Sequence, residues 1–292
     1  MKAFSWYGGK NRMTHKISFL IPEHTAYYEP FMGSAAVLLN HPRSRLEVIN
    51  DLDPNIFHFM KTLADREKGR ALIERLWRAW YGRGFFEEAL CASRNNYEEL
   101  DDIEKAAMIY TLVTQSFNCT GKSFSKGGFR NTSGYRDDIQ FNLPQVHERL
   151  RDVRIRNMDG IDLLEKISSH ESAFAFVDPP YRKELRGRNA DKVYACELPH
   201  KQQVRLLETI QNTRCKIMLC GYRSEKGTDL YDRYLLSHGY KCYKLMDIVK
   251  ACQNKESKDI AQEFIWVNYK LPDIARYVIS LKEYGTDETV CS

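Results

Sequence analysis

The chain has 292 residues and carries 44 lysines and arginines against 39 aspartates and glutamates, which gives a formal net charge of +5. That length can hold one large core with an inserted region, since single cores stop growing near ~250–300 residues, and the mild positive charge is compatible with an anionic partner. Because the sequence has no signal peptide, no apolar run of about 18 residues and no Cys-x-x-Cys pair, we expect a cytoplasmic protein with reduced thiols, no membrane span and no metal site.

A strand, a small-residue turn at Gly33 and a helix are predicted in succession over residues 26–40. This order opens the nucleotide-binding half of a doubly wound sheet, although one glycine in the turn is fewer than a dinucleotide fingerprint has. The next strand ends at Asp51, about 20 residues after the turn, where an acid binds the ribose hydroxyls of an adenosine-containing cofactor. Asp53 is the nearby alternative for that contact.

Amphipathic helices follow the second strand, over 56–63, 71–80 and 103–117. An all-helical stretch between two strands is typical of an inserted second domain. The predicted bounds are 54–150 for the inserted helical domain, 1–53 with 151–270 for the other domain, and 271–292 for a peripheral C-terminal tail.

The helical stretch ends in a basic, aromatic segment over 116–136 that contains no acid. Cations there could bind phosphate while aromatic rings and flexible glycines probe bases, so we predict a loop or hairpin that contacts nucleic acid. The four cations are Lys122, Lys126, Arg130 and Arg136, and Arg130 is the candidate base reader. An ordinary solvated loop is the alternative interpretation.

The apolar run over 173–177 predicts a buried strand, and Asp178-Pro179-Pro180-Tyr181 follows where that strand would end. Open α/β sheets bind ligands at this edge. Two prolines donate no backbone hydrogen bond and resist helix, so the backbone after Asp178 is stiff, with its carbonyls turned outward. A carboxylate, a rigid carbonyl and the Tyr181 ring together suit a planar base with an exocyclic amine. A strand-terminating turn is the alternative.

A second basic run directly follows this motif and could bind the phosphates of a nucleic-acid backbone around a flipped base. Its cations are Arg182, Lys183, Arg186 and Arg188. A solvated loop is again the alternative.

Seven strands are predicted in all. They span 26–31, 45–51, 153–159, 173–178, 215–222, 240–248 and 262–270. Helical patterns over 34–40, 201–208 and 230–236 separate several of them. Because strands alternate with helices, we predict an α/β fold with a mostly parallel sheet.

Three blocks stand in order along the chain: Trp6-Tyr7-Gly8-Gly9-Lys10, Glu29-Pro30-Phe31-Met32-Gly33, and Asp178 to Tyr181. They resemble the N-terminal motif, the methionine-binding turn and the catalytic motif of the Dam-like DNA adenine-N6 methyltransferases. Their order is similar to the alpha arrangement of that family, in which the target-recognition region lies between the cofactor and catalytic blocks. The resemblance implies a Rossmann-like methyltransferase sheet with an inserted, mainly helical target-recognition domain and S-adenosylmethionine as cofactor.

The same resemblance implies roles for individual residues. Those implied to bind the cofactor are Trp6, Lys10, Phe31, Gly33, Asp51, Asp159 and Asp178. Within this set Asp159 would read the adenine amine of the cofactor, with Asp162 as the alternative. The second turn glycine of the family is Ala35 here, which we expect to be tolerated only with a negative φ.

The resemblance and the motifs predict a site-specific DNA methyltransferase that methylates the N6 amine of an adenine flipped out of the duplex. In the catalytic motif, Asp178 and the Pro179 carbonyl would accept the two amine hydrogens, Pro180 would stiffen the backbone and Tyr181 would stack on the base. The alternatives are a same-fold methyltransferase acting on RNA adenine, cytosine N4 or a protein glutamine, and a non-catalytic DNA-binding module. We expect double-stranded DNA as partner and a monomer in solution, and a companion restriction endonuclease is compatible with the resemblance.

Overall fold

A computed structural model describes residues 1–6, 8–126, 129–186, 196–224, 229–249 and 260–285 of the chain. The chain divides into two compact units. Unit 1 comprises Met1–Thr14, Met32–Arg43 and Glu47–Asn157, and unit 2 comprises His15–Phe31, Ser44–Leu46 and Met158–Ser292.

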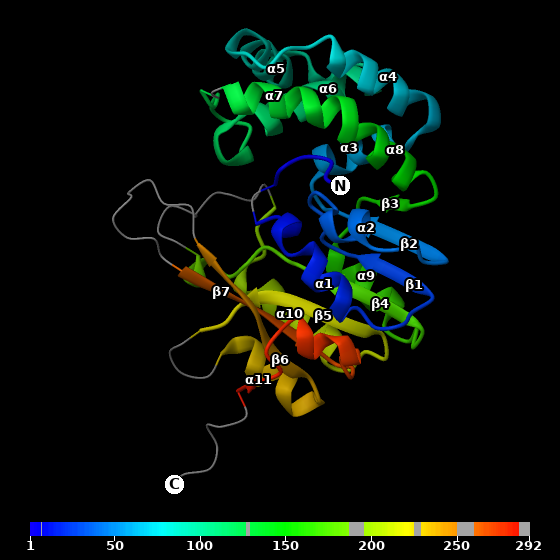
Figure 1. The fold of residues 1–292 in the computed structure, drawn as a ribbon, viewed down its shortest axis with the longest axis vertical. Helices are drawn as coiled ribbons and strands as arrows, with labels where there is room; N and C mark the ends of the chain where they lie inside the picture. The colour runs from blue at the N-terminus through cyan, green and yellow to red at the C-terminus, as the bar shows by residue number, and fades with distance from the viewer. Residues whose placement is uncertain (7, 127–128, 187–195, 225–228, 250–259, 286–292) are drawn as a thin grey trace. The chain divides into compact units, whose positions relative to one another are not determined.

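The strands form one eight-stranded sheet in the order β3-β2-β1-β4-β5-β7-β6-β8 (Figure 1). Their bounds are β1 Ala26–Glu29, β2 Leu46–Asn50, β3 Arg154–Arg156, β4 Ala173–Val177, β5 Lys216–Tyr222, β6 Lys241–Val249, β7 Ile260–Val267 and β8 Glu283–Tyr284. β4 pairs in parallel with β1 and β5, and β2 pairs in parallel with β3, whereas β7 is antiparallel to β5 and β6. The sheet confirms the predicted α/β fold.

In unit 2, the most apolar predicted strand lies between two parallel neighbours. All five residues of β4 are buried, as expected for a strand covered on both faces of a sheet. The α-helices in the described part of this unit are α1 (Thr14–Leu20, from the last residue of unit 1), α9 (Gly160–Ile167), α10 (His200–Gln211) and α11 (Leu230–Leu235). Because β1, β4 and β5 are parallel, their carboxyl ends meet at one edge of the sheet, and the catalytic motif begins there.

Unit 1 is mostly helical. Its α-helices are α2 (Ala36–Asn40), α3 (Pro54–Ala64), α4 (Arg66–Trp77), α5 (Arg83–Asn95), α6 (Asp102–Gln115), α7 (Phe129–Asp137) and α8 (Leu143–Leu150). Three of them begin at aspartates whose side chains accept backbone N–H groups of the first turn, Asp53 for α3, Asp65 for α4 and Asp101 for α6. α6 packs against α3, α4 and α5, and buries Ala106, Ile109 and Tyr110.

All seven predicted strands are present, with shorter bounds for β3, and β8 is additional. Helices α3 to α8 follow β2 and precede β3, where we predict an inserted domain. The bounds of that domain stay a prediction, because the two compact units divide the chain at other residues.

Two local expectations differ from the structure. The second half of the basic segment is helix α7 and not a hairpin, although an isolated antiparallel bridge joins Ser116 to Phe124 in its first half. The C-terminal stretch is not peripheral as far as Tyr284, because β8 pairs with β6 while Ala275 and Ile279 are buried. Among the helices described, none has the length and apolarity needed to cross a membrane.

Candidate active site

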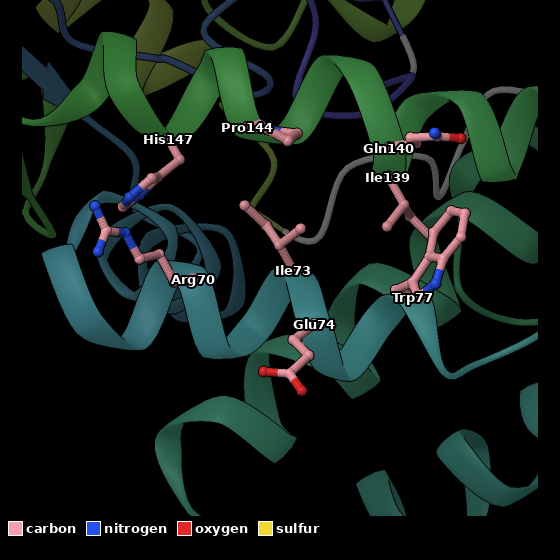
Figure 2. A pocket seen from close by; sticks show the side chains of 8 residues that line it. All are labelled: Arg70, Ile73, Glu74, Trp77, Ile139, Gln140, Pro144 and His147. Atoms are coloured by element: carbon pink, nitrogen blue, oxygen red, sulfur yellow. The ribbon is translucent and has the colours of Figure 1, made fainter.

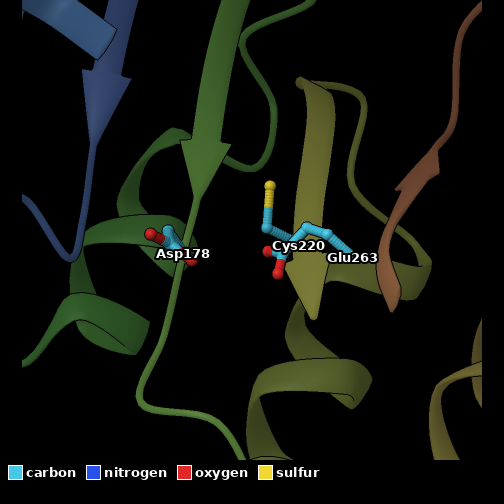
Figure 3. A group of neighbouring side chains, drawn as sticks. All are labelled: Asp178, Cys220 and Glu263. Carbon is cyan, nitrogen blue, oxygen red and sulfur yellow. The ribbon is translucent and has the colours of Figure 1, made fainter. Parts of the chain in front are cut away.

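Asp178 follows the carboxyl end of β4 and lies beside two side chains from other strands. Ligand atoms of Asp178, Cys220 of β5 and Glu263 of β7 lie within 4.8 Å of one another (Figure 3). Cys220 and Glu263 are buried, whereas Asp178 is partly exposed. Asp178 is therefore the member of this cluster with surface open to a ligand.

The cluster also has ligand types that a metal ion could use, and it is the group of this kind found among the described residues. Glu263 already accepts a hydrogen bond from the Tyr181 hydroxyl. The hydrogen bond shows that Glu263 has a partner without a metal ion. A site without a metal therefore stays our prediction.

Tyr181 is buried, with 6% of its surface exposed. Its ring packs edge-on against Tyr222, with ring centroids 4.7 Å apart, and its hydroxyl donates to Glu263. Burial raises the pKa of Tyr181 well above its ordinary value, and the carboxylates of Asp178 and Glu263 raise it further. The hydroxyl therefore stays a donor, and little of the ring is open for the base stacking that the sequence predicts.

The small-residue turn after β1 is held by Asp51. Gly33 has a φ of +47°, which favours glycine, and its N–H donates to Asp51 Oδ2 at 2.9 Å. A Cβ on Gly33 would lie 2.9 Å from the Trp6 indole, so the ring and the turn approach each other closely. Trp6 and Gly33, which the resemblance places together at the cofactor, are thus brought together.

The expectation for Ala35 is wrong. Its φ is +50° and its ψ +35°, so it adopts the left-handed conformation that an L-residue occupies at a cost of about 1–2 kcal/mol. Ala35 is fully buried and directly precedes α2, so this strain is held by the packing of the turn.

Asp51 keeps both oxygens engaged with backbone. In addition to the Gly33 bond, Oδ1 accepts the N–H of Asp53 at 3.0 Å. Burial raises the pKa of Asp51 to about 6, and the N–H groups of Asp53 and Gly33 oppose that rise. Asp53, the alternative ribose acid, is 8% exposed and accepts the N–H of Asn55 as the N-cap of α3, which favours Asp51 as the ligand-binding acid.

Lys10, the other N-terminal residue implied to bind the cofactor, is buried. Its Nζ donates to the Gly8 carbonyl at 3.3 Å. Of the residues predicted to bind the cofactor, Trp6, Lys10, Gly33 and Asp51 lie in unit 1.

In unit 2, Asp159 directly precedes α9, whose first residue, Gly160, lies against the Phe31 ring. Its Oδ1 accepts the N–H of Ile161 at 2.7 Å, and a Cβ on the intervening Gly160 would lie 2.8 Å from the Phe31 ring. Asp159 Oδ2 is 3.6 Å from Arg205. Asp162 is bound more closely by Arg205, at 2.5 Å, which leaves Asp159 the better candidate for reading an adenine amine.

Each unit, taken by itself, offers chemistry that suits part of an adenosine-containing cofactor. Asp51 supplies a carboxylate acceptor for hydroxyls, and Asp159 a carboxylate acceptor for an amine. Phe31, partly exposed, supplies a ring face for a planar base.

The cations of the basic segment differ in their surroundings. Lys122 and Lys126 are exposed. Arg136 instead lies over the rings of Trp77 and Trp80, at 3.8 and 4.9 Å, and donates to the Trp77 carbonyl at the end of α4. Because the Arg136 guanidinium already has these partners, it is a poorer candidate for a DNA contact than the two lysines. The Arg130 side chain lies outside the described residues.

Two cations of the second basic run, Arg182 and Arg186, have ion-pair partners inside unit 2, which does not favour the DNA contacts predicted for them. Arg182 is buried and donates to Asp229 at 2.6 Å, and the Arg186 side chain is 4% exposed and forms an ion pair with Glu197. Both guanidinium groups are thus used inside the fold. Lys183 is exposed, and Arg188 lies outside the described residues.

Sequence reasoning missed Glu263, Cys220 and Gln203. Glu263 could have been noticed, because it directly precedes Phe264-Ile265-Trp266-Val267 inside a predicted strand, where an acid is rare unless it has a partner. Gln203 and Cys220 lie in ordinary helical and strand patterns that carry no such signal.

A cavity of about 520 Å³ lies in the helical part of unit 1, between α4 on one side and the helical turn Asp138–Asn142 with α8 on the other (Figure 2). It is lined by Arg70, Ile73, Glu74, Trp77, Ile139, Gln140, Pro144 and His147. None of the predicted site residues lines it, so the cavity does not add to the candidate active site.

Comparison with known proteins identifies relatives over most of the chain. A family model described as D12 class N6 adenine-specific DNA methyltransferase matches residues 6–250. The chain is 25% identical over 239 residues to the type II methyltransferase M1.LlaDCHI of Lactococcus lactis subsp. cremoris, covering 77% of this chain and 82% of that one. It is 28% identical over 181 residues to the DNA N-6-adenine-methyltransferase of Escherichia phage P1, covering 61% of this chain and 24% of that protein. An rRNA methylase structure from Streptococcus thermophilus aligns at 8% identity and a TM-score of 0.34, covering 88% of this chain and 96% of that one.

Proposed function

Because the chain belongs to the D12 class of N6 adenine-specific DNA methyltransferases, which use S-adenosylmethionine, we propose that the edge of the sheet around Asp178 is where methyl transfer occurs. The finer activity we propose is that of a site-specific enzyme methylating adenine in double-stranded DNA, acting as a monomer in the cytoplasm. A companion restriction endonuclease is compatible with it, since one relative is a type II methyltransferase.

The observation that carries the proposal is the position of Asp178. It follows a fully buried strand, is partly exposed, and is continued by two prolines that fix the carbonyls after it. An adenine amine is a poor nucleophile because its lone pair is delocalised into the ring. Asp178 and the Pro179 carbonyl would accept its two hydrogens and favour the pyramidal nitrogen that develops during transfer.

Cofactor binding is divided among the remaining residues. Asp51 would accept the ribose hydroxyls, Asp159 the adenine amine, and Trp6 and Gly33 would lie at the methionine end, with Lys10 and Phe31 beside them. When bound, S-adenosylmethionine supplies a methyl group already activated by its sulfonium. The target adenine must leave the duplex to reach it, and Lys122, Lys126 and Lys183 are the exposed cations we propose for holding DNA phosphates.

The test is transfer of labelled methyl from S-adenosylmethionine to DNA, RNA and protein by the wild type and by Asp178→Asn and Asp178→Ala. We expect label in DNA adenine for the wild type, a rate reduced about 100-fold or more for Asp178→Asn and a larger loss for Asp178→Ala. A neutral amide oxygen can still accept one amine hydrogen, but it stabilises the positive charge developing on the nitrogen less than a carboxylate does, and alanine accepts none. Cofactor affinity is measured beside the rate. Label in RNA, cytosine or protein, or an Ala variant as fast as the wild type, would refute the proposal.

A further inference from the structure

Gln203 of α10 is fully enclosed and contacts the catalytic motif. It is 1% exposed, and its Nε2 donates to the Pro180 carbonyl at 2.8 Å. Its Oε1 accepts from the Tyr231 hydroxyl at 2.7 Å. A buried glutamine with both ends of its amide engaged is a connecting element between α10, α11 and the motif.

The orientation of this amide is fixed by its partners. The Pro180 carbonyl can only accept a hydrogen bond, so the amide NH₂ must face it and Oε1 must face Tyr231. Burial raises the pKa of Tyr231, so its hydroxyl stays protonated and donates to Oε1. Tyr231 therefore acts on the Pro180 carbonyl through Gln203.

Tyr231 is itself held on several sides. It is 1% exposed, its ring packs edge-on against Trp266 with centroids 5.1 Å apart, and the Arg182 guanidinium lies 4.5 Å from its ring centroid. Asp229 caps α11 through the Tyr231 N–H and also pairs with Arg182. The donor that orients Gln203 thus belongs to a rigid, satisfied network.

The last two residues of the motif and the residue that follows it are consequently anchored to different elements. The Pro180 carbonyl is bound by α10, the Tyr181 hydroxyl by Glu263 of β7, and the Arg182 side chain by Asp229 at the start of α11. The two groups proposed to bind the adenine amine, on Asp178 and Pro179, directly precede these anchors. The orientation of the peptide between Pro179 and Pro180 therefore depends on the Gln203 bond to the next carbonyl.

We infer that Gln203, oriented by Tyr231, is a positioning residue for methyl transfer that fixes the direction of the Pro179 carbonyl. This inference rests on the proposed function of Asp178 and Pro179. Gln203 contacts neither substrate nor cofactor in this proposal. Its loss should slow the chemical step and leave the binding of both ligands nearly unchanged.

The test compares Gln203→Met, which keeps the side-chain length and removes both hydrogen bonds, with Gln202→Met on the same helix as the matched control. Single-turnover methylation under saturating cofactor and DNA should be about 30- to 100-fold slower for Gln203→Met, since small misplacements in an active site cost up to about 100-fold. Dissociation constants for S-adenosylmethionine and DNA should stay within about threefold. Gln202→Met should react at the wild-type rate.

Tyr231→Phe serves as the second variant, because it keeps Gln203 and removes the donor that orients it. It should be about 3- to 10-fold slower with unchanged ligand affinities, as expected for a contact acting through another residue. This variant decides the question if Gln203→Met does not fold, and a wild-type rate for Tyr231→Phe would then overturn the inference.

The inference is also overturned if folded Gln203→Met reacts like the wild type, or if its slower rate comes with an equal loss of ligand affinity. If the wild type methylates adenine and Gln203→Met reacts at the same rate, Gln203 has no positioning role and the proposed function is unaffected. A wild type that methylates no DNA removes the proposed function itself.

Discussion

The acids at strand ends hold backbone as well as offering groups to a ligand. Asp51 accepts the N–H groups of Gly33 and Asp53, and Asp159 caps α9. Spacing in the sequence can find such acids, because a strand-end acid and a helix N-cap follow short local patterns. Spacing cannot tell Asp51 from Asp53, which differ in their packing, nor could it show that Ala35 takes a positive φ.

Cofactor affinity should depend on the ionisation of Asp51. Its pKa in the folded chain is about 6, above the usual 3.8, so the carboxylate ionises as the pH rises through 6. Because the unfolded chain loses this proton first, folding stability falls as the pH rises from about 3.8 to about 6. The ionised form accepts ribose hydroxyls better. We expect the dissociation constant for S-adenosylmethionine to rise up to about 10-fold from about pH 7 to about pH 5, measured by calorimetry.

Asp51→Asn is the control for this pH dependence. It should bind the cofactor more weakly at neutral pH and show a flat profile over the same range, whereas Asp53→Asn should keep the wild-type profile. An Asp51→Asn profile as steep as that of the wild type would show that another group titrates.

At the scale of helices and strands, the sequence predicts what local periodicity determines. The buried run of β4 and the amphipathic stripes of α3, α4 and α6 lie where the patterns place them, because each element must bury its own apolar face. These local patterns do not predict contacts between residues that are far apart in the sequence. Tyr181 and Glu263 are 82 residues apart, so their hydrogen bond could not be predicted from either segment alone.

The ion pair between Arg149 of α8 and Glu47 of β2 is another long-range contact of this kind. Arg149 donates to both Glu47 oxygens, at 2.6 and 2.7 Å, and to the Leu38 carbonyl at 2.9 Å, with both side chains buried. Arg149→Met would leave Glu47 buried without its counter-charge. We expect the free energy of unfolding to fall by about 3–5 kcal/mol, measured by urea denaturation.

A double variant and a variant of an exposed ion pair serve as controls for the effect of Arg149→Met. Replacing both partners, Glu47→Leu with Arg149→Met, should recover most of the loss, because no unpaired charge then remains. Arg151→Met, which removes the exposed pair with Glu148, should change stability by less than about 1 kcal/mol. A loss for Arg149→Met no larger than that of Arg151→Met would contradict the argument.

At the scale of the whole molecule, a net charge of +5 says less about DNA binding than the surroundings of each cation. Of the residues proposed from sequence, Lys122, Lys126 and Lys183 are exposed, whereas Arg182 and Arg186 neutralise acids inside unit 2. A run of basic residues in the sequence does not show which cations are exposed and which are paired, because pairing depends on which acids the fold brings near. Exposed cations can release counterions from DNA, whereas internally paired ones cannot without breaking the fold.

The salt dependence of DNA affinity should therefore change when an exposed cation is removed and stay the same when an internally paired cation is removed. Lys122→Ala, Lys126→Ala and Lys183→Ala should each weaken binding on all duplexes and lower the slope of log affinity against log salt by about 0.9, the value for one phosphate contact. Arg186→Ala should leave that slope unchanged and reduce thermal stability, because it leaves the Glu197 carboxylate without its partner. An Arg186→Ala variant that folds with wild-type stability and loses salt slope would place this arginine on DNA after all. Three lysine variants with wild-type slopes would show that none of these lysines contacts a DNA phosphate.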